Sequence, residues 1–220
     1  MRQLGLPFAH TPAFAEFLPA PSNEAARRWL TRCAEWPEGR LALWGEAGCG
    51  KTHLLHLWAG AVPLAGPALR GLPEIAGERL AIDDADACPD EPALLHLLNA
   101  AAEAGTPALL AARTPPSRWP VRLADLQSRL RAITAVEIGP PEDALLKALL
   151  ERLLAERQLP VAPALQEWLL LRLPRTAGAV REAVARLDAA ALAAGGGVTR
   201  ALAASVLGEL TPRAATPNPL

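Results

Sequence analysis

The octapeptide Gly45-Glu46-Ala47-Gly48-Cys49-Gly50-Lys51-Thr52 has the spacing G-x-x-x-x-G-K-[ST], which is typical of a loop that binds nucleotide phosphates. In such a loop the glycines let successive backbone N–H groups point at phosphate oxygens, and the following helix adds its partly positive N-terminus. Lys51 would reach the β- and γ-phosphates, and Thr52 would bind Mg²⁺. The pattern predicts a phosphate site formed by Gly45, Gly48, Cys49, Gly50, Lys51 and Thr52. A glycine-rich turn that binds nothing is the alternative.

Two carboxylates, Asp83 and Asp84, directly follow a second apolar run that begins at Leu80. Because the carboxyl ends of parallel strands meet at one edge of a sheet, we expect this pair at the same edge as the phosphate loop. Asp83 would hold Mg²⁺ through water, and Asp84 would polarise an attacking water, although Asp reaches less far than Glu. Acidic residues at a strand end are also common on protein surfaces, which is the alternative interpretation.

Four short apolar runs have the length and character of buried strands: Arg40 to Trp44, Arg79 to Asp83, Ala108 to Ala112, and Ile133 to Ile138. The segments between them have helical patterns, which are clearest at Ser22 to Ala34, Gly50 to Ala59 and Pro92 to Ala104. This alternation predicts an α/β fold, with a parallel sheet that carries helices on both faces.

The pattern changes at Gly139-Pro140-Pro141, because leucines then recur at helical spacing and no strand-like run follows. The expected helices are Glu142 to Arg157, Pro163 to Leu173, Thr176 to Ala190, and Thr199 to Leu210. We therefore expect a nucleotide-binding α/β domain at 13–139 and a helical domain at 140–210. The proline-containing ends, 1–12 and 211–220, are predicted to be a flexible segment and a disordered tail. A helical bundle that serves only for packing is the alternative for the second domain.

The composition narrows the class of protein. The chain is 51% hydrophobic and its 22 Lys and Arg nearly balance 23 Asp and Glu, which excludes a wholly disordered protein. Its longest uncharged stretch, Leu54 to Leu69, contains two prolines and is shorter than the roughly 20 apolar residues that span a membrane. Three cysteines and no secretory pattern favour the cytoplasm. A net charge of −1 without a basic cluster predicts that DNA is reached only through a partner.

The residues around the loop resemble a known family. Lys51-Thr52-His53-Leu54-Leu55-His56 is similar to the GKTHLLH signature of the DnaA-related AAA+ ATPases, which adds His53 to the predicted nucleotide site. Phe14 to Leu18, followed by Ser22-Asn23, resembles the family's segment near the adenine and implies roles there for Leu18 and Asn23. The resemblance extends from about Phe14 to Leu210. It implies a P-loop AAA+ parallel-sheet core with a C-terminal all-helical lid domain, and bound ADP or ATP with Mg²⁺.

Two arginines take roles from this resemblance. Ser128-Arg129-Leu130 is similar to the family's arginine-finger motif, so Arg129 would enter the nucleotide site of a neighbouring subunit in trans; Arg131 is a weaker candidate. Val180-Arg181-Glu182 resembles the motif whose arginine contacts phosphates in cis, which implies that role for Arg181. Arginines on solvated helix faces are the usual alternative for both.

The amino terminus resembles a partner-binding peptide of the same family. The residues Gln3, Leu4, Leu6, Pro7 and Phe8 match the sliding-clamp-binding pattern Q-L-x-L-P-F at the start of Hda-type regulatory inactivators of DnaA. In that mode Leu6 and Phe8 fill an apolar groove on the clamp's β subunit, and Pro7 limits the entropy lost on docking. The alternative is an apolar strand tucked onto the domain. The expected absence of a DNA-reading helix-turn-helix domain also fits the Hda type.

Two departures from the family pattern bear on activity. Arg113 stands where the family has an acid that senses the γ-phosphate, so we expect weak intrinsic ATPase activity at most. Only about 27 residues separate Thr52 from Leu80, which shortens the region where the initiator contacts single-stranded DNA.

The sequence thus predicts a cytoplasmic, clamp-tethered, nucleotide-bound negative regulator that stimulates ATP hydrolysis by DnaA, with self-association left open. An autonomous ATPase of the helicase-loading or remodelling type and a non-enzymatic clamp adaptor are the alternatives.

Overall fold

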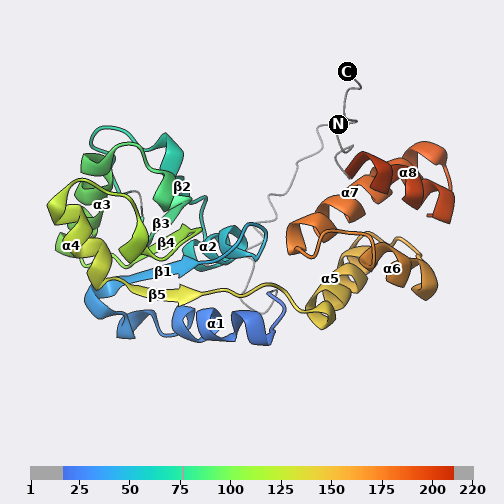
Figure 1. Cartoon of the computed structure of the whole chain (residues 1–220), viewed down its shortest axis with the longest axis horizontal. Coiled ribbons are helices and arrows are strands. Elements are labelled where there is room, and N and C mark those ends of the chain that lie inside the picture. Colours follow the sequence, from blue (N-terminus) through green and yellow to red (C-terminus); the bar gives the residue numbers. More distant parts are fainter. Residues whose placement is uncertain (1–16, 76, 211–220) are drawn as a thin grey trace, which may run out of the picture. The chain divides into compact units, whose positions relative to one another are not determined.

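The computed structural model describes residues 17–75 and 77–210, which form two compact units (Figure 1). The first unit contains Asn23–Glu46 and Gly50–Ile138 together with residues 17–19. The second contains Ala20–Ser22, Ala47–Cys49 and the described residues from Gly139 onward. The peptide at Gln3 to Phe8 and the tail at 211–220 lie outside the described residues.

The first unit is built on a parallel sheet of five strands, counted over the described residues, in the order β2-β3-β4-β1-β5. The strands are β1 (Arg40–Trp44), β2 (Leu64–Ala65), β3 (Leu80–Asp83), β4 (Ala108–Ala112) and β5 (Thr134–Glu137). Central strands β1 and β4 pair from Arg40 with Ala108 to Trp44 with Ala112. All of β4 is buried, which explains its continuous apolar sequence, because helices cover both faces of such a sheet.

Four α-helices of the described residues flank this sheet: α1 (Glu24–Leu30), α2 (Lys51–Ala59), α3 (Glu91–Glu103) and α4 (Ala124–Ala132). Leu97 of α3 and Leu126 of α4 pack in one cluster with Ile82 and Leu110 from the strands. Side chains alternate along a strand, so the neighbouring residues face the other side. Helix α2 packs against β3 and β4, and α1 against β5. The predicted sheet with flanking helices is confirmed.

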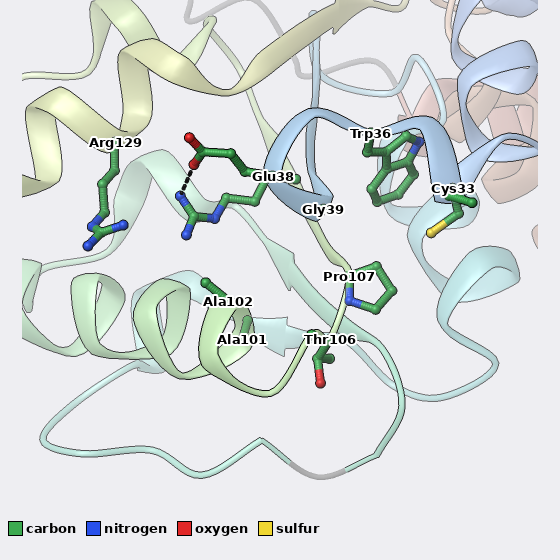
Figure 2. Close-up of a pocket in the computed structure, with 12 residues that line it drawn as sticks. Cys33, Trp36, Glu38, Gly39, Ala101, Ala102, Thr106, Pro107 and Arg129 are labelled. Carbon is green, nitrogen blue, oxygen red and sulfur yellow. Dashed lines mark hydrogen bonds and ion pairs between the residues drawn. The ribbon is translucent and has the colours of Figure 1, made fainter.

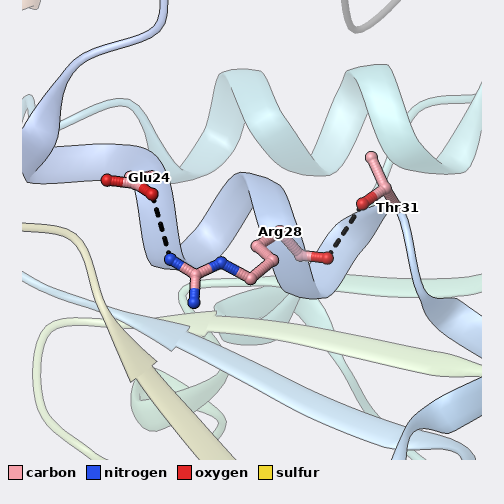
Figure 3. A network of polar contacts seen from close by, with 3 residues as sticks. All are labelled: Glu24, Arg28 and Thr31. Atoms are coloured by element: carbon pink, nitrogen blue, oxygen red, sulfur yellow. Dashed lines mark hydrogen bonds and ion pairs between the residues drawn. The ribbon is translucent and has the colours of Figure 1, made fainter.

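Helix α1 has exposed polar contacts between Glu24, Arg28 and Thr31 that contribute little to its stability (Figure 3). Arg28 and Glu24 form an ion pair one turn apart at 3.0 Å, with both side chains exposed. The Thr31 hydroxyl donates to the Arg28 carbonyl oxygen at 2.9 Å near the end of the helix. An exposed pair of this spacing contributes about 0.3–0.5 kcal/mol. The burial of Ala26 and Leu30 therefore matters more for this short helix.

The second unit is helical throughout the part that the structure describes. Its helices are α5 (Asp143–Glu156), α6 (Pro163–Leu170), α7 (Ala177–Ala194) and α8 (Arg200–Leu210). Helix α7 is central, because it packs against both α5 and α8. The Thr176 hydroxyl caps its start by accepting the Ala179 N–H at 3.1 Å, and Gly195 ends it in a left-handed conformation. The expected all-helical C-terminal region is confirmed.

One strand adds to the predicted elements, and helix α4 lies in a segment that was expected to be helical without stated bounds. Strand β2 has two residues, too few to show a periodic pattern, and it pairs with β3 through Leu64 and Ile82. Helix α4 carries the polar residues of 124–132 and buries only Leu126 and Leu130. No helix within residues 17–75 and 77–210 has the length and hydrophobicity that crossing a bilayer requires.

Candidate functional site

The phosphate loop connects the end of β1 to the start of α2, as its sequence predicts. Gly45, Gly48 and Gly50 have φ values of 154°, 80° and 106°. Residues with side chains rarely adopt these conformations, so the glycines permit the curled backbone. The Gly45 N–H donates to the Ala112 carbonyl oxygen at 3.3 Å, which joins the loop to the end of β4.

The Lys51 side chain folds against the backbone of this loop. It is 7% exposed, and its Nζ atom donates to the carbonyl oxygens of Gly45 at 2.8 Å and Glu46 at 2.9 Å. A buried ammonium needs such partners, because desolvation penalises an unpaired charge. Thr52, the next residue, is exposed in the first turn of α2. Cys49 is buried in the loop.

The segment before α1 packs onto the start of α2 within the first unit. The Phe17 and His53 rings stack with centroids 5.5 Å apart. A Cβ atom on Gly50 would lie 3.2 Å from the Phe17 ring, so this glycine also makes room for the close contact. Buried Asn23 donates from its side-chain amide to the Leu18 carbonyl oxygen at 3.0 Å. The structure thus brings His53, Leu18 and Asn23 together beside the loop.

Asp83 and Asp84 occupy the carboxyl end of β3, with strand β4 between β3 and the strand of the phosphate loop. Asp84 is exposed and has a φ of 48°, and its N–H donates to Asp83 Oδ1 at 3.1 Å. Gly66 packs directly on this turn, because a Cβ there would lie 2.3 Å from the Asp84 carbonyl oxygen. The backbone around the two acids is therefore held closely, while the Asp84 side chain faces solvent.

Arg113 lies immediately after β4, the strand between the loop and the acids. Its backbone N–H donates to Asp86 Oδ2 at 2.9 Å, which links the turn after β3 to the turn after β4. Asp86 was not predicted as a site residue. In the sequence it is only a third acid in Asp83-Asp84-Ala85-Asp86, and its contact with Arg113 depends on the order of the strands.

Thr52 and Asp83 are suitable donors for Mg²⁺, because the ion prefers hard oxygen ligands and is usually held by one or two protein groups plus phosphates and water. Within the described chain, no group of three His, Cys, Asp or Glu side chains could hold a metal by itself. A Mg²⁺ ion would therefore need the nucleotide phosphates as ligands as well, and would neutralise their charge.

Arg129 lies at the amino ends of the parallel strands, whereas the phosphate loop lies at their carboxyl ends. It is on α4 and is half-buried, whereas Arg131 on the same helix is exposed. Arg129 lines a pocket of about 730 Å³ together with Arg40, the first residue of β1, and Pro107, which directly precedes β4 (Figure 2). Those residues mark the amino ends of the strands whose carboxyl ends adjoin the phosphate loop. The phosphate loop and Arg129 therefore lie at opposite ends of the strands.

Arg181 lies in the first turns of α7, in the second unit. Burial lowers the pKa of its guanidinium, the positive charge of Arg152 lowers it further, and Glu156 raises it. The predicted clamp-binding residues Gln3, Leu4, Leu6, Pro7 and Phe8 lie outside the described residues.

No protein-family model matches this chain, and no curated protein matches it in sequence. Solved structures do match. Domain III of the Thermotoga maritima replication initiation protein DnaA aligns over 90% of this chain and 95% of its own, with a TM-score of 0.72 and 17% identity. AMPPCP-bound DnaA from Aquifex aeolicus aligns over 79% of this chain, with a TM-score of 0.62 and 14% identity. This chain spans 63% of the length of that protein.

The Thermotoga maritima RuvB Holliday junction branch migration motor also matches, over 90% of this chain and 72% of its own, with a TM-score of 0.65 and 19% identity. At such identities the likeness concerns the fold. The parallel sheet with flanking helices and the helical C-terminal region, which the sequence predicted, share the fold of DnaA domain III and RuvB.

Proposed function

We propose that this chain is a nucleotide-bound negative regulator of replication initiation, which supplies Arg129 to a nucleotide held by DnaA and so stimulates ATP hydrolysis there. The observation that carries the proposal is the placement of Arg129 and the phosphate loop at opposite edges of one sheet. The five-residue strand β1 between these edges is about 16 Å long. An arginine side chain is shorter than that, so Arg129 is suited to a nucleotide on another subunit.

The phosphate loop supports binding of ADP or ATP by this chain itself. Its backbone curl, the amino end of α2 and the Lys51 ammonium would surround the phosphates. Thr52 and Asp83 would hold Mg²⁺. The likeness to a DnaA structure determined with AMPPCP agrees with this proposal. We propose that Arg181 would add a positive charge from the helical unit.

We expect slow ATP hydrolysis by this chain alone, because of the residues at the carboxyl ends of β3 and β4. Arg113 stands where the family has an acid, and Asp84 is the remaining candidate to polarise water. The bound nucleotide would then act mainly as a structural ligand. Arg129 in turn would place a planar cation on the charge that develops at the γ-phosphate of DnaA, an effect of about 10³- to 10⁵-fold in rate in related systems.

The test of Arg129 mixes the purified protein with ATP-bound DnaA and clamp-loaded DNA and measures phosphate release. Arg129→Ala should remove the stimulation, and Arg131→Ala, on the same helix but exposed, should retain it. Equal stimulation by Arg129→Ala and the unmodified protein would contradict the proposal.

The clamp tether is a separate part of the proposal and rests on the sequence pattern from Gln3 to Phe8. A double variant, Gln3→Ala with Phe8→Ala, should lose retention on immobilised sliding clamp while nucleotide affinity is unchanged. His10→Ala, just outside the pattern, is the matched control. Retention of the double variant would show that another surface binds the clamp, and failure of the unmodified protein to be retained would show that this chain does not bind the clamp.

The likeness to the RuvB motor favours a second candidate, an autonomous ATPase. Rapid phosphate release by the protein alone, abolished in Lys51→Ala, would support this candidate, and Arg113 in the acid position argues against it.

A further inference from the structure

Two pockets of the first unit meet at the same pair of residues, Glu38 and Arg129. One has a volume of about 730 Å³ and the other about 330 Å³, and both side chains line both of them. Glu38 comes from the turn before β1 and Arg129 from α4, so 90 residues of sequence separate them. Figure 2 shows the two side chains reaching the same side of the larger pocket from these two elements.

Glu38 has a strained backbone. Its φ is 50° and its ψ is 25°, the left-handed region that side chains other than glycine, asparagine and aspartate seldom occupy. Such strain persists where the surrounding structure imposes it, and it is frequent at functional sites. A glycine at this position would adopt the same conformation without strain, so the glutamate side chain is the feature that needs a reason.

The carboxylate of Glu38 is held by a buried cation. Arg40 is 3% exposed, donates from Nη1 to Glu38 Oε2 at 3.1 Å, and donates from Nη2 to the Leu98 carbonyl oxygen at 3.2 Å. Leu98 is in α3, so Arg40 is bonded to a core helix on one side and to the Glu38 carboxylate, whose side chain is 66% exposed, on the other. Within the described chain its buried Nε atom has no hydrogen-bond partner.

Arg40 and Arg129 are close enough for their charges to interact. Burial lowers the pKa of the Arg40 guanidinium, the Glu38 carboxylate raises it, and the charge of Arg129 lowers it again. Arg40 and Glu38 line the larger pocket with Arg129, and Asp125, one turn before Arg129 on α4, lines the smaller pocket with Glu38 and Arg129. Two cations and two anions therefore surround the place where the pockets meet. Arg40, which is buried and hydrogen-bonded, repels Arg129, whereas the carboxylates of Glu38 and Asp125 attract it.

We infer that Glu38, held in its strained turn by Arg40, is a positioning residue that sets the direction of the Arg129 guanidinium. This inference rests on the proposed role of Arg129 in trans. The carboxylate limits where the guanidinium can lie at the pocket rim, and the buried Arg40 prevents Arg129 from folding back into the pocket. An arginine that is already oriented loses less conformational entropy when it meets a phosphate.

The larger pocket does not by itself indicate a bound small molecule. Both terminal nitrogens of Arg40 already donate to protein oxygens. The carboxyl end of α3 also contributes Ala101 and Ala102 to the lining, and its partial negative charge disfavours an anion. The arrangement is better suited to holding a side chain in place than to capturing a ligand.

The experiment compares Glu38→Gln and Glu38→Gly in the DnaA-stimulation assay, at saturating protein, together with thermal unfolding. Both variants should lower the maximal stimulated rate by about 10- to 100-fold, the usual range for a misplaced catalytic group. Both variants remove the carboxylate that pairs with buried Arg40, but only Glu38→Gly also removes the strain, so Glu38→Gly should melt at a higher temperature than Glu38→Gln. Glu35→Gln is the matched control and should stimulate normally, because Glu35 pairs with Arg32 at 3.6 Å and does not line either pocket.

The outcomes separate the two proposals when Arg129→Ala is measured in parallel. If Arg129→Ala stimulates as well as the unmodified protein, the proposed function fails. If Arg129→Ala is inactive but Glu38→Gln is normal, the function stands and the positioning role is wrong. If both Glu38 variants regain the normal stimulated rate at a temperature where thermal unfolding shows them fully folded, Glu38 is merely structural, and the inference is overturned.

Discussion

The two edges of the parallel sheet differ in how their functional residues are assembled. At the carboxyl edge, eight consecutive residues supply the phosphate loop, and its ammonium donates to carbonyl oxygens of the loop itself. At the amino edge, one pocket is lined by Glu38, Arg40 and Arg129, which come from different elements. They share this pocket only because helix α4 packs on the sheet that contains β1. Local chain geometry thus forms the first site, and tertiary packing forms the second.

The largest effect should come from a change that both edges share. Leu109, in the middle of β4, is fully buried, and Leu109→Ala should lower the free energy of unfolding by about 2–5 kcal/mol. Urea unfolding followed by tryptophan fluorescence measures this loss. Leu72→Ala, at a residue 77% exposed, should change stability by no more than about 0.5 kcal/mol. Comparable losses for the two variants would mean that β4 is not the common support.

A change confined to the carboxyl edge should affect nucleotide binding by this chain, whereas a change at Arg129 should affect only the stimulation of DnaA. Lys51→Ala removes the buried ammonium and should weaken nucleotide binding about 100-fold or more, equivalent to roughly 3 kcal/mol. Titration calorimetry with ADP measures it. The control is Lys147→Ala, at the other lysine of the chain, which is exposed on α5. Arg129→Ala should leave ADP affinity unchanged, and a loss there would erase the distinction between the edges.

The link between the turns at the carboxyl edge should have a smaller effect. Asp86→Ala removes the acceptor of the Arg113 N–H and should cost about 1 kcal/mol of unfolding free energy. Asp86→Asn retains a carbonyl oxygen that can accept the same bond, so its loss should be smaller. Chemical unfolding of the two variants side by side provides the measurement, and an equal loss would show that the hydrogen bond is not the cause.

The smallest effect concerns pH and the start of α3. Hydrogen bonds from the N–H groups of Gly71 and then Ala93 lower the pKa of Asp90 below its ordinary value of 3.8. A lowered pKa stabilises the fold above about pH 3.8, and this stabilisation is lost as the pH falls through the folded-state pKa. The difference in melting temperature between the unmodified protein and Asp90→Asn should therefore shrink below about pH 4. A difference that stays constant down to pH 3 would argue against this account.

Most of the fold could be predicted from sequence because its elements have strong local signals. The apolar runs of β1, β3 and β4 and the leucine spacing of α5 reflect burial. The run predicted as a fourth buried strand forms β5, an edge strand in which only Val136 is buried. Strand β2 could not be predicted, since two residues have no period. The segment that contains α4 was expected to be helical, but its bounds could not be given, because the helix is largely polar with a narrow buried stripe. Their positions depend on partners distant in the chain.

The amino-acid sequence by itself determined the phosphate loop, because three glycines, a lysine and a threonine within eight consecutive residues carry the whole pattern. It also determined the alternation that builds the sheet. Only the tertiary structure decided that Arg113 meets Asp86, that Phe17 packs on Gly50, and that Glu38 and Arg40 adjoin Arg129. These contacts depend on strand order and helix packing, which position residues through long-range burial and leave no periodic trace in the chain.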